Sequence, residues 1–105
     1  MGRSDDMKPT ILRIARDDLK EINEILSEYG KTPTRRFRES FETFCKNVEH
    51  MPYMYSQYEY HTKYRRAVIA YDYLVFYQVD DLTNKVTIYR VLHGKRNVET
   101  FLEVQ

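Results

Sequence analysis

Glycine, proline and cysteine are scarce in this sequence: 105 residues include three glycines, three prolines, one cysteine and no tryptophan. No glycine-rich phosphate loop, serine nucleophile elbow or HExxH helix is present. The single cysteine, Cys45, excludes an internal disulfide and agrees with a reducing compartment. It has no CxxC partner, and the three histidines share no ligand spacing, so we expect no metal site and no cofactor.

Long apolar runs are also missing, which excludes a transmembrane helix, and the N-terminal residues contain no apolar stretch typical of a secretory signal. We therefore expect a cytoplasmic protein without membrane contact. With 42% hydrophobic and 31% charged residues, the chain suits one small globular domain. We predict that residues 8–105 form that domain and that residues 1–7 are a disordered N-terminal extension.

Net charge is small overall, but charge is unevenly distributed along the chain. The formal net charge is only +1, yet residues 61–97 hold seven Lys or Arg against three Asp or Glu. Ten tyrosines are present, most of them between Tyr53 and Tyr77. This basic and tyrosine-rich part of the chain is where we look for function.

The first half of the chain predicts one strand and two helices. Pro9 to Ile14 is too short for a helix before Asp17-Asp18, and predicts an N-terminal strand. From Arg16 to Tyr29 the apolar residues recur at helical spacing and predict a first helix. Asp17-Asp18 would lie in its first turn, and Gly30 would end it. A second helix follows. Thr32 is its predicted N-cap, Pro33 is its first residue, and it ends near His50. Its apolar face is made by Phe37, Phe41, Phe44, Cys45 and Val48.

The second half predicts three strands, at residues 64–71, 74–79 and 86–92. The gap at Asp72 and Tyr73 is too short for a helical crossover, so the strands should form an antiparallel meander with the middle strand paired on both sides. Residues 51–63 have no clean period and predict a loop, and residues 98–105 a short tail that packs on the sheet. The fold class is therefore α+β: an N-terminal strand, an antiparallel two-helix hairpin and a three-stranded meander.

The cationic and aromatic residues of the meander could hold RNA, because arginine binds phosphate bidentately and tyrosine stacks on bases. Candidate nucleic-acid contacts are Arg65, Arg66, Tyr77, Lys95 and Arg96. Cleavage without a metal would need a base, an acid and cations at the phosphate, which Arg65, His93 and Arg96 could supply. The alternative is that these are ordinary exposed strand residues and that His93 only ends a strand.

The order of the elements, together with YLVFYQVDD and VTIYRVLHGKRN, resembles the RelE/ParE superfamily of toxins from bacterial type II toxin–antitoxin systems. The likeness runs from about Lys8 to Phe101. Its most specific part is Arg90 to Asn97, which is similar to the Arg-Val-Leu-His-Gly-x-Arg-Asp ending of ParE-like members, with Asn97 in place of the aspartate.

The resemblance implies a toxin that forms a hetero-oligomer with a cognate antitoxin, and two activities occur in the superfamily. ParE-like members act on DNA gyrase, whereas RelE-like members cut messenger RNA on the ribosome. RelE-like nucleases carry an arginine where this chain has Leu74 and a tyrosine near the C-terminus where it has Phe101. A near-zero net charge also suits a ribosome-binding nuclease poorly. The ParE-like branch is therefore favoured, with no catalytic residues of its own.

The interpretation favoured by the resemblance is a plasmid-stabilisation toxin that inhibits gyrase. Its target-binding residues would be Arg90, His93, Lys95, Arg96 and Phe101. The residues expected to bind the antitoxin are Leu19, Ile22, Leu26 and Tyr29. Two alternatives stay open: a ribosome-dependent endoribonuclease using Arg65, His93 and Arg96, and a degenerate member that only binds its antitoxin.

Overall fold

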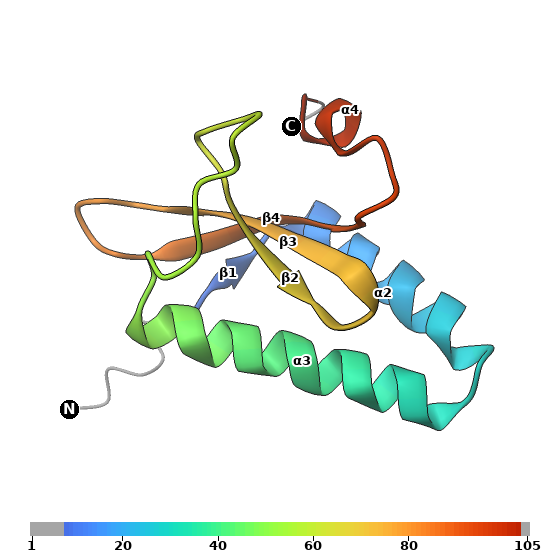
Figure 1. Cartoon of the computed structure of the whole chain (residues 1–105). Helices are drawn as coiled ribbons and strands as arrows, with labels where there is room; N and C mark the ends of the chain where they lie inside the picture. Colours follow the sequence, from blue (N-terminus) through green and yellow to red (C-terminus); the bar gives the residue numbers. More distant parts are fainter. Residues whose placement is uncertain (1–7, 104–105) are drawn as a thin grey trace.

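The computed structural model describes residues 8–103, so the predicted N-terminal extension at residues 1–7 lies outside the described residues. The described chain forms a four-stranded sheet in the order β1-β4-β3-β2. Figure 1 shows α3 running along one face of the sheet beside α2, while the short helix α4 lies over the opposite face. The α+β fold class and the two-helix hairpin are thus confirmed.

Within residues 8–103, no helix is both long and apolar enough to cross a membrane.

The N-terminal strand β1 is shorter than predicted, because only Thr10–Ile11 pairs with β4, in parallel. Leu12 is still extended, with its N–H donating to the Ile88 carbonyl at 3.1 Å, but its own carbonyl already accepts from Arg16 N–H at 2.9 Å. The chain therefore turns directly into α2, Arg13–Ser27. The earlier start places Asp18 beyond the first turn, where it is buried. The prediction that this acid lies in the first turn of the helix was wrong.

Helix α3, Lys31–His50, begins two residues earlier than predicted. Gly30 is the N-cap residue at φ 109°, a left-handed conformation that glycine adopts without strain, and there is no side-chain cap. Thr32 and Pro33 consequently lie inside the first turn. The predicted apolar face is confirmed, since all three phenylalanines and Val48 are buried.

The antiparallel meander is confirmed, and β3 is paired on both sides. Its strands are β2 at Arg65–Ile69, β3 at Tyr73–Val79 and β4 at Val86–His93. Residues 70 and 71, predicted as strand, instead belong to the short 3-10 turn η1, Ala70–Asp72. Tyr71 and Asp72 both have a left-handed backbone conformation, and the chain reverses direction there. The C-terminal helix α4, Val98–Glu103, packs Val98 and Leu102 onto the sheet.

Each face of the sheet carries its own apolar cluster, as the alternation of strand side chains requires. Val75, Tyr77 and Ile88 pack on the helices, whereas Phe76 and Leu92 pack beneath α4. An irregularity between Phe76 and Tyr77 shifts the register against β4, where Phe76 pairs with Arg90 and Tyr77 with Ile88. The result is a three-layer arrangement in which β4 lies between α2 on one side and α4 on the other.

The reversal between β2 and β3 gives a stability prediction. Tyr71 and Asp72 adopt φ values of 61° and 62°, which glycine and asparagine favour in tight hairpins. We expect Asp72→Gly to raise the free energy of unfolding by about 0.5–1 kcal/mol, and the Tm by a few degrees. Urea titration measures the change. Asp17→Gly, in the exposed middle of α2, is the matched control and should be destabilising; an unchanged or lowered stability in Asp72→Gly would contradict the argument.

Candidate functional site

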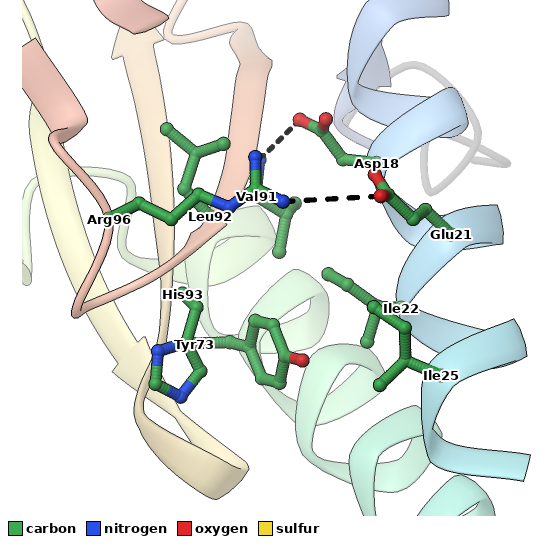
Figure 2. Close-up of a pocket in the computed structure, with 9 residues that line it drawn as sticks. All are labelled: Asp18, Glu21, Ile22, Ile25, Tyr73, Val91, Leu92, His93 and Arg96. Carbon is green, nitrogen blue, oxygen red and sulfur yellow. Dashed lines mark hydrogen bonds and ion pairs between the residues drawn. The ribbon is translucent and has the colours of Figure 1, made fainter. Parts of the chain in front are cut away.

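A groove runs between α2 and the C-terminal end of β4. It contains a cavity of about 290 Å³, whose lining side chains are drawn in Figure 2. They are Asp18, Glu21, Ile22, Ile25, Tyr73, Val91, Leu92, His93 and Arg96. Two of the residues expected to contact a target, His93 and Arg96, thus face a concave surface.

The inner end of the groove is closed by a buried ion pair between α2 and β4. The Arg90 Nε and Nη2 atoms donate to the two Asp18 carboxylate oxygens, each at 2.8 Å, and the Val91 N–H donates to Asp18 Oδ2 at 3.0 Å. Because β1 is only two residues long, this part of the β4 edge has no strand partner, and the carboxylate takes that role. Arg90 also donates to the Phe101 carbonyl at 3.3 Å, which ties α4 to the same pair.

Arg90 was expected to contact a target, yet its side chain is only 7% exposed. Its guanidinium binds Asp18 and the Phe101 carbonyl, so we assign Arg90 to the fold and not to a contact surface. The sequence pattern Arg-Val-Leu-His-Gly contained no signal of this, since the partner lies 72 residues away.

At the outer end of the groove the chain turns tightly as β4 ends. We call the side chains of His93, Lys95 and Arg96 at this turn the basic corner. Gly94 lets this turn approach β3 closely, because its N–H donates to the Asp72 carbonyl at 2.9 Å and an added Cβ would lie 3.1 Å from that oxygen. Lys95 N–H donates to His93 Nδ1 at 3.2 Å, so a neutral His93 carries its proton on Nε2.

The Arg96 side chain lies over the Phe101 ring, 5.0 Å from its centroid, and reaches across the groove to Glu21 at 3.9 Å. Both charged side chains are exposed, at 44% and 59%, so this ion pair contributes little stability. Lys95 is exposed as well. The basic corner therefore presents two cations to solvent, one of them supported by an aromatic ring.

The residues suggested for phosphodiester cleavage are not brought together. In the sheet, Arg65 pairs with Tyr77 and His93 pairs with Tyr73, so they are separated by four residues along β3, about 13 Å. The Arg65 guanidinium donates to the Tyr55 carbonyl at 2.7 Å and covers the Tyr53 ring at 4.9 Å. It organises the loop of residues 51–64 far from the basic corner.

Two other candidates for nucleic-acid contact, Arg66 and Tyr77, also contact other parts of the fold. Arg66 lies 5.6 Å from the ring centroid of Tyr58, which belongs to the apolar cluster beneath α4. Leu74, which occupies the position of the nuclease arginine, packs against the apolar cluster beneath α4. Tyr77 is fully buried, and its hydroxyl donates to the Pro52 carbonyl at 3.0 Å. It cannot stack on a base in this arrangement.

Burial of Tyr77 predicts a loss of stability at high pH. Desolvation raises the pKa of Tyr77 to about 12, against 10.0 for a free tyrosine. As the pH rises from 10 to 12, the unfolded chain loses this proton first, so stability should fall by about 1–3 kcal/mol. Tyr77→Phe should reduce the slope of that decline, although it loses the hydrogen bond to Pro52. Urea titrations across this pH range measure the slopes, and parallel curves for wild type and variant would contradict the prediction.

Of the residues expected to bind an antitoxin, Ile22 and Leu26 are buried in the core and Leu19 is half-buried, whereas Tyr29 is 74% exposed. A second cavity, of about 440 Å³, adjoins the groove. Ile25 and Tyr71 line it with Tyr29, and they are 41% and 39% exposed. Sequence periodicity missed Ile25 because it lies beside the buried stripe of α2, and missed Tyr71 because we expected it within a strand.

Within residues 8–103, no group of three or more metal-ligating side chains lies close enough together to hold a metal ion.

Comparison with known proteins places the chain in a family. The family model for the ParE toxin of the type II toxin–antitoxin system parDE matches residues 11–98. A chain from the chromosomal ParDE system of P. aeruginosa is similar in structure, with a TM-score of 0.61 and 12% identity. The alignment covers 83% of this chain and 97% of that one, and at this identity it shows the fold alone. None of the curated proteins compared with the chain matches it. On the family match, which spans α2, α3 and strands β2 to β4, this chain belongs to the ParE toxin family of type II toxin–antitoxin systems.

Proposed function

We propose that this toxin inhibits DNA gyrase by binding it through the basic corner and the adjoining face of α4, without catalysing a reaction of its own. The observation that carries the proposal is the separation of Arg65 from His93 and Arg96. Cleavage would need these groups around one phosphate, whereas Arg65 is distant and Lys95 and Arg96 are exposed next to each other. Exposed arginine over an aromatic ring is typical of residues that dominate protein interfaces.

The target is tested with purified toxin and gyrase on relaxed plasmid DNA. We expect supercoiling to be blocked at toxin concentrations comparable to that of gyrase. Undiminished supercoiling at a large molar excess of toxin would reject gyrase as the target. Primer extension on translated messages serves as the second arm, and cuts at the ribosomal A site would favour the nuclease alternative.

A growth test separates both active mechanisms from a degenerate toxin. Expression of the chain in a bacterial cytoplasm without its antitoxin should arrest growth, and co-expression of the antitoxin should restore it. Normal growth at verified toxin levels would support a member that binds its antitoxin and has lost toxicity.

The antitoxin is proposed to dock on the rim formed by Ile25, Tyr29 and Tyr71. This rim adjoins the groove that ends at His93 and Arg96, so one bound segment could cover both surfaces. We expect Ile25→Asp to weaken antitoxin binding at least tenfold, as measured by titration calorimetry, because it places a charge on an apolar contact. The matched control is Leu82→Asp, at a 95% exposed position in the loop between β3 and β4. Equal binding by both variants would exclude this rim as the docking site.

A further inference from the structure

We infer that the free end of the helical hairpin holds a binding site for the phosphodiester backbone of duplex DNA. The connection between α2 and α3 forms a shallow concavity of about 430 Å³, at the hairpin end seen in Figure 1. It is lined by Ser27, Gly30, Lys31, Thr34, Arg35 and Arg38. Three cationic side chains therefore converge on one surface that is distinct from the basic corner.

The three cations share one face of α3. Lys31, Arg35 and Arg38 follow each other at spacings of four and three residues, which places neighbours one turn apart. All three side chains are exposed, and within residues 8–103 none of them forms an ion pair or a side-chain hydrogen bond. Glu39 and Glu42 follow in the next turn and limit the cluster, but neither pairs with it.

This arrangement does not benefit the helix itself. Like charges one turn apart repel each other, and cations near the start of a helix oppose its dipole. The first turn of α3 has no acidic residue that would offset them. Among the described residues, no carboxylate forms an ion pair with this cluster, and an external anion would lower the repulsion.

The spacing of the cations suits a polyanion. Lys31 to Arg38 spans seven residues, or about 10 Å along the helix axis. Duplex DNA carries one phosphate per ~3.4 Å along each strand, so this length matches about three successive phosphates of one strand. Two of the three side chains are arginines, whose forked guanidinium groups bind phosphate oxygens bidentately.

The surface has little means of reading bases. The hydroxyls of Thr34 and Ser27 donate to the backbone carbonyls of Gly30 and Glu24, at 3.3 and 2.8 Å. The free side-chain donors of the concavity are therefore its charged groups, which contact phosphate without distinguishing sequence. We accordingly expect binding that depends strongly on salt and little on the DNA sequence. The inference does not rest on gyrase as the target, because DNA alone is the ligand.

The test is fluorescence anisotropy of a labelled 20-base-pair duplex with the full-length toxin at about 50 mM salt. We expect Arg35→Gln/Arg38→Gln to weaken binding at least fivefold and to lower the slope of log K against log salt by about two. The control Lys20→Gln/Lys46→Gln removes the same charge from exposed positions elsewhere on the two helices and should change binding less than twofold. Circular dichroism checks that each variant is folded.

Three results would overturn the inference. The first is the absence of DNA binding by the wild-type toxin under these conditions. The second is equal weakening by the two double variants, which would attribute binding to net charge alone. The third is displacement of the duplex by tripolyphosphate as efficiently as by unlabelled duplex at equal phosphate concentration, which would indicate a site for small phosphates.

Discussion

Asp18→Ala is expected to lower the free energy of unfolding by about 3–5 kcal/mol, the largest effect of any single substitution considered for this protein. The variant would leave the Arg90 guanidinium buried without its carboxylate, and the Val91 N–H without an acceptor at an unpaired part of the β4 edge. Urea titration followed by circular dichroism measures the loss.

A second variant separates the ion pair from simple loss of packing. In Asp18→Leu/Arg90→Met both charges are absent, so no buried charge is left alone and at least half of the lost stability should return. A loss below about 1 kcal/mol in Asp18→Ala would contradict the burial of this pair. So would a double variant as unstable as the single one.

Lys95→Ala/Arg96→Ala is expected to raise the toxin concentration needed for half-inhibition of gyrase at least tenfold. Contact residues of this type contribute about 2 kcal/mol or more when they lie at the centre of an interface. The double variant should keep its stability, because both side chains are exposed and the Arg96–Glu21 pair is weak. The measurement is the plasmid supercoiling assay across a toxin dilution series.

Lys46→Ala is the matched control, since Lys46 is exposed on α3 and lies outside the basic corner and the hairpin concavity. It should give the same result as the wild-type toxin in the supercoiling assay. Full inhibition by a folded Lys95→Ala/Arg96→Ala variant would show that the basic corner is not the contact surface.

Local pattern was sufficient for most of the fold. The helical spacing of Phe37, Phe41 and Phe44 predicted the buried face of α3, because a stripe of aromatic residues at that period must be covered. The short gap before β3 likewise excluded a crossover and predicted the meander. Pattern failed at element ends, where Gly30, and not Thr32, caps α3 through its backbone conformation.

The candidate site was predicted only in part. His93, Lys95 and Arg96 follow one another in the chain, so their proximity needed no tertiary information. The separation of Arg65 from them depends on strand register, and the burial of Arg90 depends on a carboxylate from another element. The exposed apolar rim at Ile25 and Tyr71 is also set by elements that meet only in the folded chain.

The sequence by itself thus determined the α+β order of elements, the buried faces of the helices and the cationic end of β4, because each follows from spacing along the chain. Tertiary structure alone decided which cations are free to bind. Arg90 is neutralised by Asp18 from a distant helix and Arg65 is held by the loop of residues 51–64, whereas Lys95 and Arg96 remain at the surface. The physical reason is that a cationic side chain can bind a target only if folding has not already placed a carboxylate or carbonyl group beside it.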